Sequence, residues 1–133
     1  MEAKLGKAER KAFEIANLLD DAADAIRKRS KRAYREGSMS LEEYMEARAR
    51  ELELRGEVSV IVGSDLSDAL ERASKAGDDI GQAIVDARAR IDKVRSVERG
   101  LKIVASLVAL AGALASGDVK RALSAGKTVI ELT

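Results

Sequence analysis

The stretch from Leu5 to Ala33 reads LGKAERKAFEIANLLDDAADAIRKRSKRA and decides the fold. Small and apolar residues recur in it at alternating spacings of three and four, with one arginine on the same line: Leu5, Ala8, Ala12, Ile15, Leu19, Ala22, Ile26, Arg29 and Ala33. This spacing places one stripe of side chains along a single helix face, with the period of coiled-coil packing. Further apolar residues widen the stripe, which favours a bundle over a narrow two-stranded seam. We therefore expect a helix over about residues 3–35 that packs in a bundle.

Residue types that favour helix are common along the whole chain. Ala, Leu, Glu, Lys and Arg make up 74 of the 133 residues, and there is no proline. Such a composition is close to that of long or coiled helices, and the length suits one domain with a shared core. The sequence predicts a single all-α domain over residues 1–133, a bundle of five or six helices. With three aromatic residues in the chain, its core must be aliphatic.

Composition also excludes several kinds of chemistry. The chain has no histidine and no cysteine, which excludes an imidazole base, a disulfide framework and a thiolate metal site. This usage is compatible with a reducing cytoplasm, where we expect the protein. The formal charge is +1, so the molecule as a whole has no electrostatic drive toward nucleic acid or anionic membranes. Any such role needs a local patch.

Local signals predict a long N-terminal hairpin. Gly37 is suited to end the first helix in the left-handed conformation, and Ser40 and Glu43 form a capping box for a second helix. That second helix carries Leu41, Tyr44, Met45 and Leu52 on one side. The β-branched segment Val58–Val62 is ambiguous: it could form a short strand, but it continues the helical spacing, and we favour helix.

Two further glycines mark expected breaks. We expect one helix to end at Gly77 and the next to be capped by Asp79, and another break at Gly117. Between them lies an apolar central helix near residues 101–116, with a ridge of small residues, Ala105, Ala109 and Ala113. This helix is too short and interrupted to span a bilayer. We expect it in the core, with self-association through the ridge as one alternative and membrane insertion, as a hairpin with residues 119–132, as another.

The densest group of charges follows Asp24 on the first helix. Five basic residues fall within about 140° of a helical wheel, opposite the apolar seam: Arg27, Lys28, Lys31, Arg32 and Arg35. We call these five residues the basic arc. It could meet an acidic protein or nucleic-acid phosphates, although the shortage of neighbouring aromatics argues against single-strand stacking. The interpretation that we favour is a solvated face paired with itself, with Asp24 bound to Lys28 at i,i+4.

One set of carboxylates suggests an enzyme. Glu42-Glu43-Tyr-Met-Glu46, followed by Asp65-Leu-Ser-Asp68, resembles the EExxE…ExxD pattern of MazG-type nucleoside triphosphate pyrophosphatases, which are small all-α oligomers that bind magnesium. The resemblance covers about residues 41–95 and implies Mg²⁺ held by oxygen ligands on two facing helices. Asp65 stands where that family has glutamate, which shortens the reach to a metal.

No catalytic constellation rises above what so charged a chain produces by chance. The sequence therefore favours a small soluble interaction or structural protein, such as an adaptor, inhibitor or assembly component, acting through helix faces without catalysis or cofactor. Its partner is expected to be another protein, a second copy of itself, or both, with the basic arc as the first candidate surface. A magnesium-dependent MazG-like pyrophosphatase and a membrane-active helical protein are the alternatives.

Overall fold

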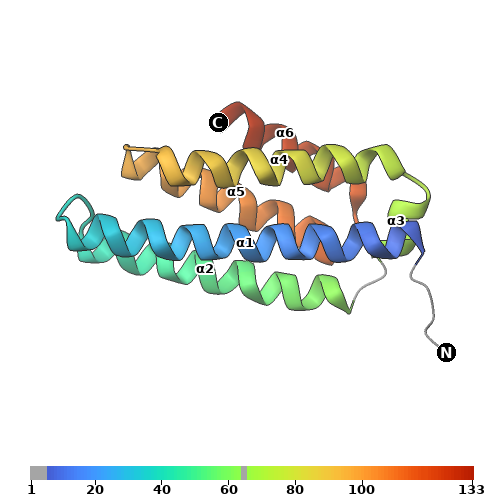
Figure 1. Ribbon diagram of the computed structural model, residues 1–133, viewed down its shortest axis with the longest axis horizontal. Coiled ribbons are helices and arrows are strands. Elements are labelled where there is room, and N and C mark those ends of the chain that lie inside the picture. The colour runs from blue at the N-terminus through green and yellow to red at the C-terminus, as the bar shows by residue number, and fades with distance from the viewer. Residues whose placement is uncertain (1–5, 64–65) are drawn as a thin grey trace.

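The computed structural model describes residues 6–63 and 66–133, and these form an all-α bundle (Figure 1). The described residues contain six helices and no strand: α1 (Lys7–Arg35), α2 (Leu41–Val62), α3 (Leu66–Glu71), α4 (Ser74–Lys93), α5 (Val97–Ala115) and α6 (Val119–Leu132). The expected fold class is thereby confirmed.

The long helices lie beside one another around one aliphatic core. α1 packs against α2 on one side and α4 on the other, α5 packs against α2 and α6, and α6 also contacts α4. Figure 1 shows α4, α1 and α2 in succession, with α5 and α6 behind them and α3 at the N-terminal end of α1. The buried side chains form a single cluster that contains no aromatic residue among those described. The hairpin of α1 and α2 therefore forms one edge of the bundle, and the outer sides of both helices face solvent.

The turn between α1 and α2 forms as the sequence predicts. Gly37 has a φ of +79°, and the N–H of Ser38 donates to the carbonyl of Ala33 at 2.9 Å. Ser40 then begins α2, since its hydroxyl accepts from the N–H of Glu43 while the Glu43 carboxylate accepts from the N–H of Ser40. These local signals fix the two helices as antiparallel neighbours.

The seam of α1 is the buried face of that helix. Ile15, Leu19 and Ala22 are fully buried, whereas Leu5 lies outside the described residues. Arg29 does not break the seam: its side chain is half-buried, and Nη2 donates to the carbonyl of Val94 at 3.0 Å. Because Val94 caps the C-terminus of α4, this arginine ties α1 to α4 at a place where a cation is favourable.

The ambiguous segment Val58–Val62 is helical. It forms the last turns of α2, with Ile61 buried at 2% exposure and Gly63 as the C-cap. The strand alternative is therefore wrong, and the preferred helix is confirmed. The helical spacing from Leu54 to Ile61 outweighs the β-branched composition because both side chains reach the shared core.

The break expected at Gly77 is wrong, since this glycine lies inside α4, which begins at Ser74. Its φ is not positive, so it serves neither as a cap nor as a turn. A Cβ at Gly77 would stand 3.0 Å from Cγ of Lys11 and 3.3 Å from Cδ2 of Leu70. The glycine therefore permits close approach of α4 to α1 and α3, a role that a one-dimensional pattern does not distinguish from a helix stop.

The apolar helix α5 begins at Val97, four residues earlier than expected, because the Ser96 hydroxyl caps the N–H of Arg99. Gly117, with a φ of +75°, ends it as predicted. Ala113 is buried, whereas Ala105 and Ala109 are exposed, so the small-residue ridge meets another helix only at its C-terminal end. None of the described helices combines the length and the apolar character needed to cross a membrane.

Candidate protein-interaction surface

α2 carries apolar side chains on two opposite faces. The inner face buries Ala47, Leu54 and Ile61 in the core. The outer face carries three apolar side chains that lie within about 40° of one another on a helical wheel and are each more than half exposed, which we call the outer stripe: Leu41, Met45 and Leu52. The side of α2 singled out in the sequence thus faces solvent instead of the core. Apolar residues standing together on an exposed helix face indicate a contact surface.

The outer stripe lines a shallow groove between α1 and α2. The groove has a volume of about 380 Å³, and its walls are Tyr34 of α1 and six residues of α2: Leu41, Tyr44, Met45, Arg48, Ala49 and Leu52. The rings of Tyr34 and Tyr44 contact each other, with centroids 4.8 Å apart. Tyrosine is common at protein interfaces because it combines apolar area with a polar end. The groove therefore resembles a protein contact more than a small-molecule pocket.

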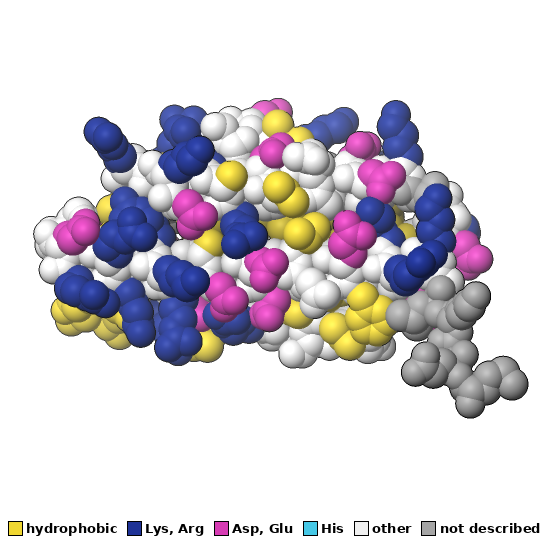
Figure 2. All heavy atoms as spheres, in the orientation of Figure 1, with side chains coloured by type: hydrophobic (Ala, Val, Ile, Leu, Met, Phe, Trp, Pro, Cys, Tyr) yellow, Lys and Arg dark blue, Asp and Glu magenta, His cyan; other side chains and the backbone are white. Residues whose placement is uncertain are grey.

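The basic arc lies on α1 beside this groove. Arg27, Lys31 and Arg35 continue, at spacings of three and four, the line of Asp20 and Asp24. That line faces α2, since Arg55 of α2 binds both aspartates. Figure 2 shows basic side chains gathered at the hairpin end of α1, with hydrophobic side chains next to them on the side of α2. The arc and the outer stripe thus form one continuous surface.

The basic arc is not paired with itself. All five of its side chains are exposed, and none makes an ion pair with any residue of the ranges 6–63 and 66–133. The expected pair of Asp24 with Lys28 is wrong, because the Asp24 carboxylate binds Nη2 of Arg55 across the hairpin at 2.8 Å. The five positive charges are therefore available to a partner.

A charge cluster joins α1 and α2 farther along the hairpin, and it was not predicted from the sequence. Glu51 is 1% exposed and binds Arg48 at 2.8 Å and Arg55 at 2.9 Å. Arg55 in turn reaches Asp20 at 3.2 Å and Asp24 at 2.8 Å. The indication in the sequence was that Glu51 lies on the inward side of α2 and has arginines at i−3 and i+4. A buried charge needs such partners.

The electrostatics of this charge cluster fix the protonation state of Asp24. The hydrogen bond from Arg55 lowers the pKa of Asp24 below its ordinary value, and the charges of Arg55, Lys28 and Arg27 act in the same direction. Asp24 is therefore ionised at neutral pH and holds Arg55 in place. Arg55 binds three carboxylates, two of α1 and one of α2, and so joins the two helices.

The carboxylates that resemble the MazG-type motif are separated by the length of α2. Glu42, Glu43 and Glu46 lie in its first turns, where Glu43 is used in the capping box, and Asp68 lies in α3 beyond its other end. From Glu46 to the last residue of α2 the helix alone extends about 24 Å. Asp65 lies outside the described residues. Within the described ranges, no group of three or more acidic residues is placed to hold a metal ion.

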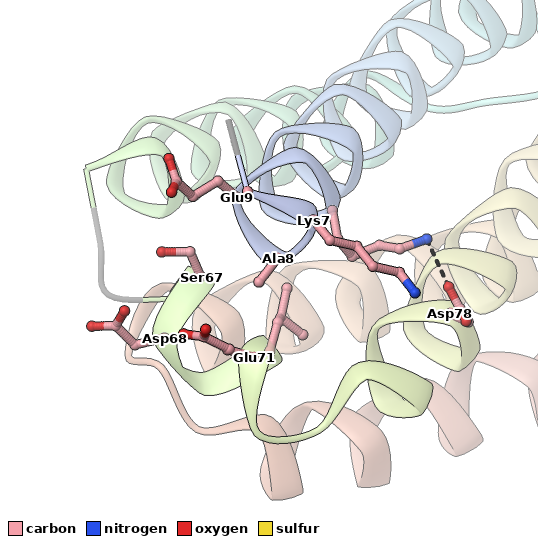
Figure 3. Close-up of a pocket in the computed structure, with 10 residues that line it drawn as sticks. Lys7, Ala8, Glu9, Ser67, Asp68, Glu71 and Asp78 are labelled. Carbon is pink, nitrogen blue, oxygen red and sulfur yellow. Dashed lines mark ion pairs between the residues drawn. The ribbon is translucent and has the colours of Figure 1, made fainter. Parts of the chain in front are cut away.

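Asp68 lines a different cleft, at the N-terminal end of α1. This cleft has a volume of about 270 Å³ and is bordered by α1, α3 and the start of α4. Figure 3 shows Asp68 and Glu9 coming from opposite walls of the cleft, and Asp78 joined to a lysine of α1 by a dashed line. That ion pair joins Nζ of Lys11 to Asp78 at 2.7 Å; the hydrogen bond raises the pKa of Lys11 and lowers that of Asp78. The cleft thus carries charges of both signs, and this ion pair holds α4 against α1.

Comparisons with protein-family models, with curated proteins and with solved structures give no match to this chain. What can be inferred about function therefore comes from the chain's own surface.

Proposed function

We propose that this protein is a non-catalytic interaction protein, an adaptor or assembly component of the cytoplasm, that binds a helix of a protein partner. The contact surface is the outer face of the α1–α2 hairpin. The partner helix has an apolar stripe that packs on Leu41, Met45 and Leu52, and an acidic flank that meets the basic arc.

The observation that carries this proposal is the second apolar face of α2, bordered by a basic arc that makes no ion pair within residues 6–63 and 66–133. Leu41, Met45 and Leu52 are 57%, 63% and 54% exposed. Covering a half-exposed side chain of this size contributes about 1 kcal/mol. The three together favour association by several kcal/mol, and charge complementarity along the arc adds specificity and speeds encounter.

The apolar stripe favours a protein over nucleic acid as the partner. A phosphate backbone would engage the basic arc but would leave Met45 and Leu52 in water. An acidic amphipathic helix covers both parts of the surface at once, as in helix-in-groove recognition.

The proposal is tested by capture with matched surface variants. The immobilised protein is incubated with a bacterial lysate and with an untagged copy of itself, and the retained proteins are identified by mass spectrometry. We expect a stoichiometric partner that is lost with Met45→Glu/Leu52→Glu. It should be retained by Val85→Glu/Ile130→Glu, which adds the same charge at residues 44% and 49% exposed on α4 and α6.

A second pair of variants tests the basic arc. Lys28→Glu/Lys31→Glu/Arg32→Glu should weaken capture of the partner. The capture that remains should depend less on salt concentration. The matched reversal on α6, Lys120→Glu/Arg121→Glu/Lys127→Glu, should not. Retention of no protein at all, or equal retention by the surface variants and their controls, would refute the proposed function.

A further inference from the structure

The outer face of α2 is bordered by opposite charges on its two sides. On the side of α1 lie Arg48 of α2 and the line Arg27, Lys31 and Arg35 of α1. On the other side of the outer stripe, about 100° to 140° from Leu41 on a helical wheel, lie three exposed glutamates that we call the acidic flank: Glu42, Glu46 and Glu53. Glu53 has Arg50 as a local partner at 3.2 Å. Glu42 and Glu46 make no ion pair with any residue of the described ranges.

The outer face of α2 itself therefore has the two features that we expect of the partner helix: an apolar stripe and an acidic flank. Resting on the proposed function, we propose that the partner is a second copy of this chain. The two α2 helices pack outer stripe to outer stripe and run parallel about a two-fold axis.

The charge pattern selects the parallel arrangement. Rotation about a two-fold axis parallel to α2 exchanges left and right between the two facing surfaces. The acidic flank of each copy therefore lies against the basic side of the other copy. A two-fold axis across α2 makes the helices antiparallel and places basic side on basic side. Like charges in contact disfavour that arrangement.

The register of the hairpin brings individual charges to the same level. α1 and α2 are antiparallel, and Tyr34 contacts Tyr44 while Asp24 contacts Arg55. By interpolation Lys31 lies level with Glu46. A two-fold axis along α2 keeps each residue at its own level, so Lys31 of one copy meets Glu46 of the other.

The remaining positions support the same packing. Arg35 lies level with Glu42 by the same register, which gives a second pair of opposite charges. Met45 and Leu52 each meet their own counterpart across the axis, as in parallel two-stranded packing. The net charge of +1 adds no long-range repulsion between copies.

The size of the surface predicts a reversible dimer. The 22 residues of α2 span about 33 Å, and the outer sides of two neighbouring helices are about 20 Å wide. The resulting area of roughly 650 Å² for each copy is slightly below the ~800 Å² of a stable interface. We therefore expect a Kd on the order of micromolar.

Charge exchange between two variants tests the proposal. Sedimentation equilibrium at low salt should show a concentration-dependent dimer for the unsubstituted protein. In Lys31→Glu both facing pairs become Glu with Glu, and in Glu46→Lys both become Lys with Lys. Each variant alone should dimerise at least about tenfold more weakly. An equimolar mixture restores both attractive pairs, so the mixture should dimerise nearly as well as the unsubstituted protein.

Two results would overturn the proposal: a protein that stays monomeric well above micromolar concentration, or a mixture that associates no better than its components. Circular dichroism of each variant confirms that these exposed substitutions leave the helices intact. If the protein stays monomeric but captures another protein through Met45 and Leu52, self-association fails and the proposed function stands. If neither occurs, both fail.

Discussion

At the scale of single residues, Glu51 has the least favourable environment in α2. Its carboxylate is 1% exposed, and the cost of taking a charge out of water is offset by the side chains of Arg48 and Arg55. Removing Glu51 leaves Arg48 without its counter-charge and takes one of three carboxylates from Arg55. The residue is therefore important for stability although it takes no direct part in the proposed contact.

We expect Glu51→Ala to lower the free energy of unfolding by about 2 kcal/mol. The loss is moderated because the Arg48 and Arg55 side chains are 44% and 29% exposed and can be hydrated. Urea denaturation followed by circular dichroism measures it. Glu53→Ala, which removes an exposed ion pair with Arg50, is the control and should change stability by less than about 0.5 kcal/mol. Equal effects would contradict the role given to Glu51.

The charge cluster also makes stability depend on pH through Asp24. Its pKa is lowered in the folded protein from the ordinary value of 3.8, so its contribution is present above that value and is lost as pH falls through the lower, folded-state pKa. Asp24→Asn should therefore be less stable than the unsubstituted protein at neutral pH. The difference is below about 1 kcal/mol, because the Asp24 side chain is 56% exposed and screened by solvent.

The two proteins should converge in stability as the pH falls from about 5 to about 2. Urea midpoints across that range measure the convergence. A difference that stayed constant with pH would assign the effect of Asp24→Asn to packing instead of charge.

At the scale of helices, glycines in helix interiors have different roles that only packing reveals. Gly112 of α5 has no heavy atom within 4 Å of the position where a Cβ would stand, whereas Gly77 of α4 has Lys11 at 3.0 Å and Leu70 at 3.3 Å. Both glycines lie inside helices, and the sequence pattern does not show which of them a neighbouring helix approaches closely.

We expect Gly112→Ala to stabilise the protein by about 0.5 to 1 kcal/mol, through helix propensity alone. Gly77→Ala gains the same propensity but displaces Lys11 from its ion pair with Asp78 and presses on Leu70, so it should lower stability. Thermal unfolding of both variants measures the contrast. A stabilised Gly77→Ala would show that α4 does not need the close approach.

The helices could be predicted largely from local signals. The seam of α1, the left-handed Gly37 and the capping box at Ser40 each depend on a few neighbouring residues, and all are confirmed. Gly77 was mistaken for a helix stop because its neighbours in space, Lys11 and Leu70, are distant in sequence. Local rules do not contain that information.

The candidate surface was less predictable for a related reason. α2 has two apolar lines, and sequence alone does not decide which one the bundle buries. The side with Leu41, Met45 and Leu52 stood out because its residues are larger, yet the bundle buries the line of Ala47, Leu54 and Ile61. The basic arc was found in sequence, but Asp24 makes its ion pair with Arg55 across the hairpin instead of with Lys28 of the arc.

At the scale of the whole molecule, one edge of the bundle differs from the rest. All three aromatic residues of the chain lie on α1 and α2, and none is in the buried core. The same hairpin carries the outer stripe, the basic arc and the acidic flank. The aliphatic core is complete without them. This division between a closed core and an outer edge with exposed apolar and charged residues is the reason for the proposal that the edge binds a partner.

The most direct test of that assignment is disulfide cross-linking at Met45, because the chain has no cysteine of its own. If two copies pack outer stripe to outer stripe about a two-fold axis along α2, the two Met45 residues face each other, and a disulfide requires such a short Cα separation. We expect Met45→Cys to form a covalent dimer rapidly under mild oxidation, and Val85→Cys, at a residue 44% exposed on α4, to remain monomeric. Equal and slow cross-linking of the two variants would contradict self-association through the outer face of α2.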